Sequence, residues 1–207
     1  MRDDLSTKLI HFTKGSNKEA AGTFLKILSE NRLLGGTGYI KGAYRCVCFT
    51  ESPIGKLVHI LANRETYHFN YAPFGVMVDK LWLWERGGRP VIYQSDEEFE
   101  LLDHKQKYRH KIYEPDKDID FTWEREWRIQ TQELMLDPEN TTIIVPNKIW
   151  VDQLLDEYME RIRLEVCGRA VLTGGWFAGS SVSRCPWHFI ALEDLGIKIK
   201  NTEVLHR

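Results

Sequence analysis

The sequence predicts a single α+β domain with flanking helices and a mostly antiparallel, split sheet. Strand-like and helix-like segments alternate without the regular βαβ repeat of a parallel sheet. The glycines lack the spacing of a dinucleotide-binding or phosphate-binding loop. No internal repeat, low-complexity tract or long linker divides the 207 residues, so we expect one domain over residues 1–207.

Composition and charge narrow the class of protein further. Hydrophobic residues make up 43% of the chain, which is enough for a sizeable core. The net charge of -2 excludes binding to nucleic acid or to an anionic membrane by overall charge, so such contacts would need a local patch. The sequence lacks a run of about 18 apolar residues and begins with polar residues. We therefore expect a cytoplasmic protein with no membrane partner.

The first elements follow from local sequence signals. Residues 8–12 form a short run with strand character. Ser16 and Glu19 have the spacing of a capping box, and apolar residues then recur at helical intervals. We expect this first helix to end at the glycine pair that begins with Gly35.

The next elements are a buried strand and a helix. Residues 45–50 are mostly apolar and predict a buried strand. Ser52 is expected to cap the helix that follows, with Pro53 at its first position. The apolar stripe of this helix continues to Leu61.

The second half of the chain predicts a similar mixture. Strands are expected at residues 74–80 and 89–93, with a glycine turn between them. Residues 96–111 are first acidic and then basic, which predicts a helix with a solvated face. The remaining predicted elements are strands at about 123–131 and 141–145 and a helix at 151–164.

The four cysteines are too sparse for a disulfide scaffold, which favours a reducing compartment. Together they could supply four thiolates to zinc, but their spacing lacks the Cys-x-x-Cys pattern of such sites. We therefore expect free thiols without a metal, and Cys46 and Cys48 as small buried residues on one face of a strand. The other two cysteines are Cys167 and Cys185.

The most polar predicted strand carries the strongest candidates for chemistry. Alternation along a strand places Glu124, Glu126 and Arg128 on one face. Trp127 and Ile129 fall on the other face, which we expect to be core. Paired carboxylates raise each other's pKa, or hold a ribose hydroxyl or a cation, while the neighbouring arginine opposes the pKa shift. The alternative is an ordinary exposed face with salt bridges.

Two further pairs of polar residues are candidates for binding. His11 and Thr13 share a face of the first strand and suit a hydrogen bond to a ribose or an amide. The alternative for His11 is a core histidine with satisfied hydrogen bonds. Thr50 and Ser52 follow a buried strand, where they line a pocket or cap the next helix.

Five blocks occur in order along the chain: residues 9–13, 47–54, 74–80, 89–93 and 124–128. With the apolar helix after the first block, this order resembles the AbiGi-type abortive-infection proteins and their relatives, over about residues 8–146. Families with these blocks are in turn similar to remote members of the ADP-ribosyltransferase superfamily. In that superfamily a His or Arg on the first strand, a Ser, Thr or Tyr on a middle strand and a Glu on a late strand surround NAD.

The resemblance implies an ADP-ribosyltransferase-like fold and a role in phage defence or in a toxin-antitoxin system. The enzyme would use NAD as its substrate and transfer ADP-ribose to a macromolecular acceptor, either protein or nucleic acid. Glu126 would be catalytic, with Glu124 beside it, because a carboxylate on the ribose stabilises the charge that grows as the glycosidic bond breaks. The implied NAD-binding residues are His11, Thr13, Thr50, Ser52, Arg128, and Tyr71 or Phe74 stacked on the nicotinamide. We expect His11, the turn at residues 50–52 and Glu126 to line one pocket.

Two other functions stay open. A degenerate form of the same fold would be a non-catalytic antitoxin or protein-binding module that binds a cognate toxin or antitoxin partner; the presence of both His11 and Glu126 favours the enzyme. A metal-dependent nuclease would use Asp79, Glu124 and Glu126, with Lys80 assisting, since two-metal chemistry needs acidic ligands from neighbouring strands.

Overall fold

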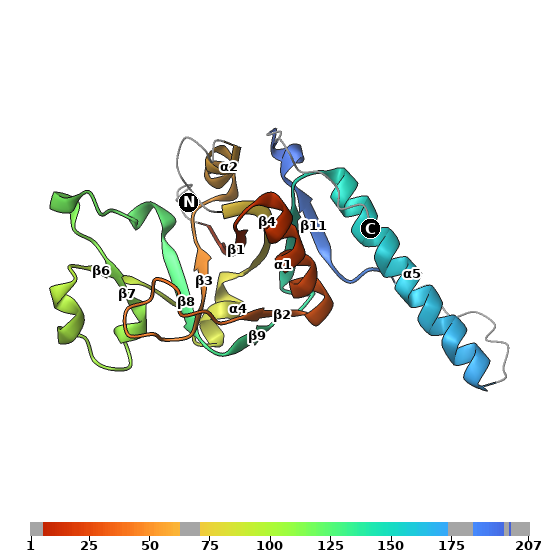
Figure 1. Cartoon of the computed structure of the whole chain (residues 1–207), viewed down its shortest axis with the longest axis horizontal. Coiled ribbons are helices and arrows are strands. Elements are labelled where there is room, and N and C mark those ends of the chain that lie inside the picture. Colours follow the sequence, from red (N-terminus) through yellow and green to blue (C-terminus); the bar gives the residue numbers. More distant parts are fainter. Residues whose placement is uncertain (1–5, 63–70, 174–183, 197–198, 200–207) are drawn as a thin grey trace.

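The computed structural model describes residues 6–62, 71–173, 184–196 and 199, and its central feature is a long sheet (Figure 1). Within these residues the sheet has seven strands in the order β11-β10-β4-β1-β3-β8-β5. Neighbouring strands are antiparallel except β10 and β11, which are parallel. The fold is α+β with a mostly antiparallel sheet, as the sequence predicts. The strands are β1 (Lys8–Lys14), β3 (Cys46–Thr50), β4 (Tyr71–Asp79), β5 (Arg89–Pro90), β8 (Glu126–Gln130), β10 (Thr141–Val145) and β11 (His188–Ala191).

The helices of the described residues are α1 (Asn17–Glu30), α2 (Ile54–Ala62), α4 (Lys80–Glu85) and α5 (Lys148–Thr173). Three of them lie where the periodicity of apolar residues predicts a helix. Helix α4 was not predicted, because it is short and directly follows β4, where the sequence indicated only a glycine turn.

Helix α1 begins as predicted and ends earlier than predicted. The Ser16 side chain accepts from the Glu19 backbone, and the Glu19 side chain accepts from the Ser16 backbone, which completes the capping box. The helix ends at Asn31, whose φ of 52° is left-handed, and not at the glycine pair. The chain then forms β2 (Arg32–Leu34), which pairs with β9 (Glu133–Met135) and buries Leu33.

The helix predicted over residues 96–111 is absent. Short 3-10 turns, η1 (Glu97–Leu101) and η2 (Lys107–Arg109), lead into β7 (His110–Ile112), which runs parallel to β6 (Ile92–Gln94). Phe99 and Tyr108 are both buried. Because they are nine residues apart, one helix would point them to opposite sides. The irregular path lets both side chains face the rest of the protein.

The two faces of the sheet carry separate cores. Helix α1 covers one face and contributes Phe24 to the larger core, which also contains Phe74 and Trp127. Helix α2 covers the other face, and its Leu57 packs beside Ile10. A residue therefore belongs to one core or the other according to its position in the strand alternation.

The sheet is weakly joined between β1 and β3. These strands share one described pair, Ile10 with Thr50, whereas six pairs join β1 to β4. Beyond this pair the His11 ring reaches β3, and its Nδ1 donates to the Cys48 carbonyl over 2.8 Å. A side chain thus replaces part of the backbone ladder where the sheet divides.

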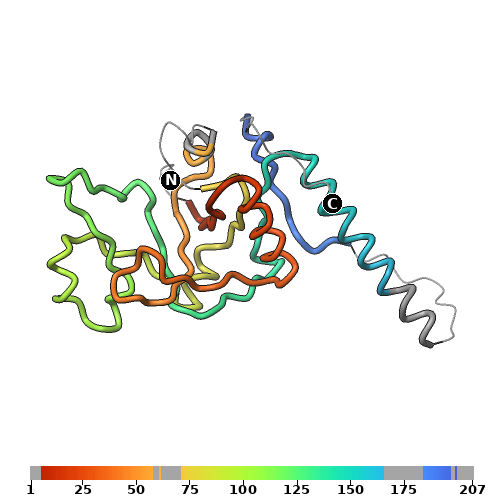
Figure 2. Tube along the Cα trace, viewed as in Figure 1, coloured from red at the N-terminus to blue at the C-terminus, as the bar shows by residue number. Residues whose placement is uncertain are grey.

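Two parts of the chain extend away from the central sheet (Figures 1 and 2). Residues 92–121, between β5 and β8, form a lobe beside the sheet, and we call them the 92–121 segment. Helix α5 packs its first turns on the larger core through Trp150, Val151 and Leu154 and then runs outward. No helix among the described residues is both long and apolar enough to cross a lipid bilayer.

Candidate functional site

The predicted alternation on β8 is confirmed from Glu126 onward. Antiparallel pairing places Glu126 opposite Thr50 and Arg128 opposite Cys48. Trp127 and Ile129 point to the larger core on the other face. Glu124 precedes the strand in the turn η4 (Thr122–Glu124), because Arg125 has a left-handed φ of 46°. The strand therefore begins three residues later than predicted.

Glu126 and Arg128 form a buried ion pair. Arg128 Nε lies 2.7 Å from Glu126 Oε1, and Arg128 Nη2 lies 3.3 Å from Glu126 Oε2. Arg128 is 1% exposed and Glu126 is 7% exposed. The remaining nitrogen, Arg128 Nη1, donates to the carbonyls of Tyr108 and His110 over 2.9 and 2.8 Å. Arg128 therefore joins β8 to the 92–121 segment.

Lys111 of β7 completes the charged group. Its Nζ lies 3.1 Å from Glu126 Oε2 and 3.3 Å from Glu124 Oε2. Two carboxylates and two cations then balance, which limits the cost of burying them. We call Lys111, Glu124, Glu126 and Arg128 the charged cluster.

The protonation state of Glu126 follows from its surroundings. Burial raises the pKa of its carboxyl, but the hydrogen bond and charge of Arg128, together with Lys111, outweigh burial and lower the pKa overall. Burial lowers the pKa of Arg128, and Glu126 more than reverses this change. Glu126 is therefore ionised at neutral pH. Arg128 lowers the pKa of Glu126, which opposes the increase that paired carboxylates were expected to cause.

Three predicted site residues lie beside the charged cluster. Tyr71 donates from its hydroxyl to Glu124 Oε1 over 3.1 Å. Thr50 donates from Oγ1 to the Glu124 carbonyl, and Ser52 donates from Oγ to the Trp123 carbonyl. The Ser52 hydroxyl, expected to cap α2, thus contacts the turn before β8. These hydroxyls fasten the turn to β3.

The other predicted residues lie on the opposite face of the sheet. Ile10 is opposite Thr50 and shares the face of Glu126, so His11, the next residue, points to the far face. There the His11 ring meets Phe49 edge-on, with centroids 5.8 Å apart. Burial lowers the pKa of His11, and its Nδ1–H donates to a carbonyl, which fits the alternative of a satisfied core histidine. The expected convergence of His11 and Glu126 on one pocket does not occur.

Thr13 and Phe74 are also engaged within the fold. Thr13 donates from Oγ1 to the Phe74 carbonyl over 2.9 Å. Phe74 is 1% exposed and packs with its ring centroid 5.5 Å from that of Phe24 and 4.8 Å from that of Trp150. The Phe74 ring has no exposed surface on which a nicotinamide would stack.

Asp79, one of the three acidic residues of the nuclease alternative, lies apart from Glu124 and Glu126. Asp79 ends β4, three strands from Glu126, which is roughly 14 Å at ordinary strand spacing. Asp79 pairs with Lys8 at 2.5 Å, and Lys80 pairs with Glu51 at 2.7 Å. Among the residues that the structure describes, no group of three or more His, Cys, Asp or Glu side chains is placed to hold a metal ion.

The described cysteines are free thiols. Cys46 and Cys48 share a face of β3, Cys185 precedes β11, and the Cys167 side chain lies outside the described residues. Burial raises the pKa of Cys46 to about 11 and that of Cys48 to about 12. Both thiols are protonated at neutral pH, whereas a metal ligand or a nucleophile is a thiolate.

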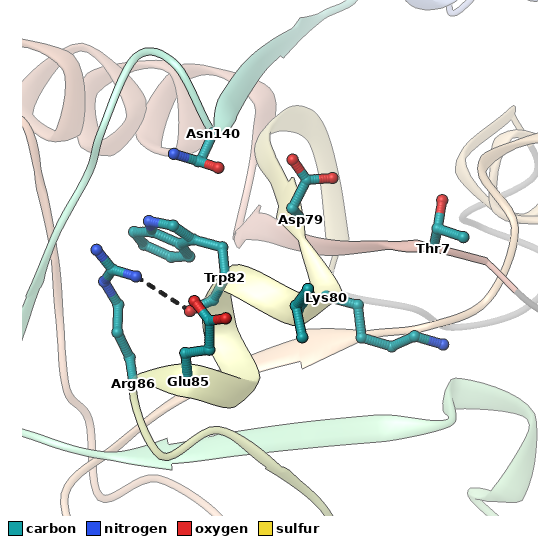
Figure 3. A pocket seen from close by; sticks show the side chains of 8 residues that line it. Thr7, Asp79, Lys80, Trp82, Glu85, Arg86 and Asn140 are labelled. Carbon is teal, nitrogen blue, oxygen red and sulfur yellow. Dashed lines mark hydrogen bonds between the residues drawn. The ribbon is translucent and has the colours of Figure 1, made fainter.

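Two cavities lie away from the charged cluster. One, of about 600 Å³, is lined at the end of β4 and along α4 by Asp79, Trp82 and Arg86 among others (Figure 3). Figure 3 shows Arg86 beside the Trp82 indole, with a hydrogen bond to the Trp82 carbonyl. The other, of about 760 Å³, lies between α5 and the segment before β11, where Met159 and Trp187 face it. Neither cavity is lined by Glu124 or Glu126.

Lys111 is the site residue that sequence reasoning missed. It belongs to the basic run before residue 112, which the sequence analysis placed on a solvated helical face. Its role depends on the parallel pairing of β6 with β7 and on the fold of the 92–121 segment onto β8. No local sequence signal indicates that contact.

Comparisons with models of known protein families, with curated proteins and with solved structures find no significant match to this chain.

Proposed function

We propose that this protein is a non-catalytic protein-binding module of an abortive-infection system, one that binds a cognate toxin or antitoxin partner. The system is inferred from the order of sequence blocks, and the non-catalytic role from the charged cluster. Both carboxylate oxygens of Glu126 are held inside the protein by Arg128 and Lys111. A glutamate that acts on NAD needs an oxygen free for the ribose hydroxyl. The separation of His11 from Glu126 supports the same conclusion.

Helix α5 offers a surface for a protein partner. It extends beyond the central sheet (Figure 2), and Met159 and Leu164 on it are 40% and 64% exposed. Most helical stability in proteins comes from packing of an apolar face. A protein that covered the outward-running part of α5 would bury Leu164 and stabilise the helix.

The proposal is tested with the full chain and the cell extract of a bacterium that carries its gene. Tagged wild type is expected to retain one protein at a fixed ratio through gel filtration, and Leu164→Asp to lose it. Leu101→Asp is the matched control, because Leu101 is 82% exposed on the 92–121 segment, away from α5. Equal retention by the two variants, or no retained protein, would reject the proposed binding role.

A second candidate function is the NAD-dependent ADP-ribosyltransferase. It is favoured by the position of Tyr71, Thr50 and Glu124 around Glu126 on one face of the sheet. Labelled NAD, incubated with wild type and extract, tests it by transfer of label into protein or nucleic-acid fractions. The binding-module proposal expects no transfer.

A further inference from the structure

The 92–121 segment covers the charged cluster but has little apolar contact with the rest of the protein. Its buried apolar side chains are Phe99 and Tyr108, in 30 residues that the structure describes completely. Tyr108 belongs to a small core with Ile40 and Cys46 that is separate from the two cores of the sheet. Regions with few buried apolar contacts open at lower free energy than the global core.

Polar contacts also attach the segment to the rest of the protein. The Glu126 backbone N–H donates to the Tyr93 hydroxyl over 3.2 Å, and Arg128 donates to two carbonyls of the segment. Lys41 pairs with Asp96 at 2.7 Å, and both groups are more than a third exposed. All of these contacts join the segment to the rest of the protein, so they would break together if the whole segment moved away.

Lys111 occupies the space between the two carboxylates. Its Nζ contacts Glu124 and Glu126 within 3.3 Å while the side chain is 15% exposed. The departure of Lys111 would leave Glu124 and Glu126 with only Arg128 as a cationic neighbour within the charged cluster. Their surroundings would then favour another ammonium or guanidinium group.

We propose that the 92–121 segment opens as a unit and uncovers Glu124 and Glu126 as a binding site for a lysine or arginine side chain of a protein partner. Lys111 is the internal competitor that fills this site when the segment is closed. That the incoming lysine or arginine belongs to a protein partner rests on the proposed binding function. The opening of the 92–121 segment does not depend on that function.

Native-state hydrogen exchange tests the opening. We expect backbone amides of the 92–121 segment to exchange together, about 100-fold faster than those of β1 and β4. Lys111→Met should increase exchange in the segment a further tenfold or so. Lys117→Met is the matched control, because Lys117 lies in the same segment and pairs with Glu114 outside the charged cluster. Segment amides that exchange no faster than those of β1 would overturn the proposal.

A fluorescent hexalysine peptide tests the uncovered site. Lys111→Met should bind it at least about tenfold more tightly than wild type, while Lys117→Met binds as wild type does. Adding Glu124→Gln and Glu126→Gln to Lys111→Met should abolish the gain. Equal binding by the two lysine variants would reject the cation site, whatever the outcome of the partner capture with Leu164→Asp, which tests the proposed function separately.

Discussion

At the scale of single residues, Glu126 has the environment of a structural carboxylate. Arg128 and Lys111 hold its two oxygens, and Arg128 also holds two carbonyls of the 92–121 segment. Removing one partner of such a pair leaves the other charge buried and unbalanced. The sequence alone predicted the common face of Glu126 and Arg128, but not the burial that decides between structural and catalytic roles.

Glu126→Gln is therefore expected to lower the free energy of unfolding by about 3–5 kcal/mol. Glu124→Gln should cost less, because its side chain is 12% exposed and contacts Lys111 and Tyr71 rather than Arg128. Urea unfolding of the two variants and wild type measures the difference. Equal stability of Glu126→Gln and wild type would show that the ion pair contributes nothing.

His11 should give the protein a pH dependence above the range of the carboxylates. Its folded pKa lies below 6.5, so the unfolded chain binds more protons between the two values, and stability falls as pH decreases below about 6.5. His11→Asn should remove this slope. The Glu126 contribution is present above its ordinary pKa of 4.5 and is lost at lower pH. Unfolding midpoints of wild type and His11→Asn, measured from pH 7.5 to pH 5, test the effect of His11. The same dependence of the midpoint on pH in both proteins would contradict it.

At the scale of elements, local signals predicted what local chemistry determines. The capping box of α1 and the alternation on β8 are short-range patterns, and both are present in the structure. The prediction of a helix over residues 96–111 is wrong, because the charge pattern does not account for the tertiary burial of both Phe99 and Tyr108. The predicted end of α1 is also wrong, because the residues after the helix form β2, which pairs with β9 about 100 residues further along the chain.

Ser16→Ala should lower the free energy of unfolding by about 1 kcal/mol, because it removes the side chain that caps α1. Ser29→Ala is the control: the Ser29 hydroxyl donates to the Lys26 carbonyl within the same helix and caps nothing. Thermal unfolding compares the two. A cost for Ser29→Ala as large as that for Ser16→Ala would contradict the role of the cap.

At the scale of the whole molecule, the residues of the predicted site lie on two opposite faces of the sheet. The sequence order of the blocks does not specify which face each residue occupies, since that depends on the pairing of β1, β3 and β8. Ile10, not His11, shares the face of Glu126. Three of the seven predicted NAD-binding residues, His11, Thr13 and Phe74, therefore serve the core or the backbone on the far face.

Trp127 contributes to the stability of the whole fold. It is 7% exposed in the larger core, and its Nε1 donates to Glu51 over 2.8 Å. Trp127→Ala is expected to destabilise by about 3–5 kcal/mol. Denaturant unfolding measures the loss, and Trp84→Ala, at a 45% exposed tryptophan beside it, should cost much less. Similar costs for the two changes would contradict the assignment of Trp127 to the core.

The most direct test of the structural role of Glu126 is a transfer assay with labelled NAD. Wild type and Glu126→Gln are incubated with cell extract, and label is followed into protein and nucleic acid. We predict no transfer by either protein above a heat-denatured control. Transfer by wild type that falls by two or more orders of magnitude in a folded Glu126→Gln variant would contradict the account and make Glu126 a catalytic residue.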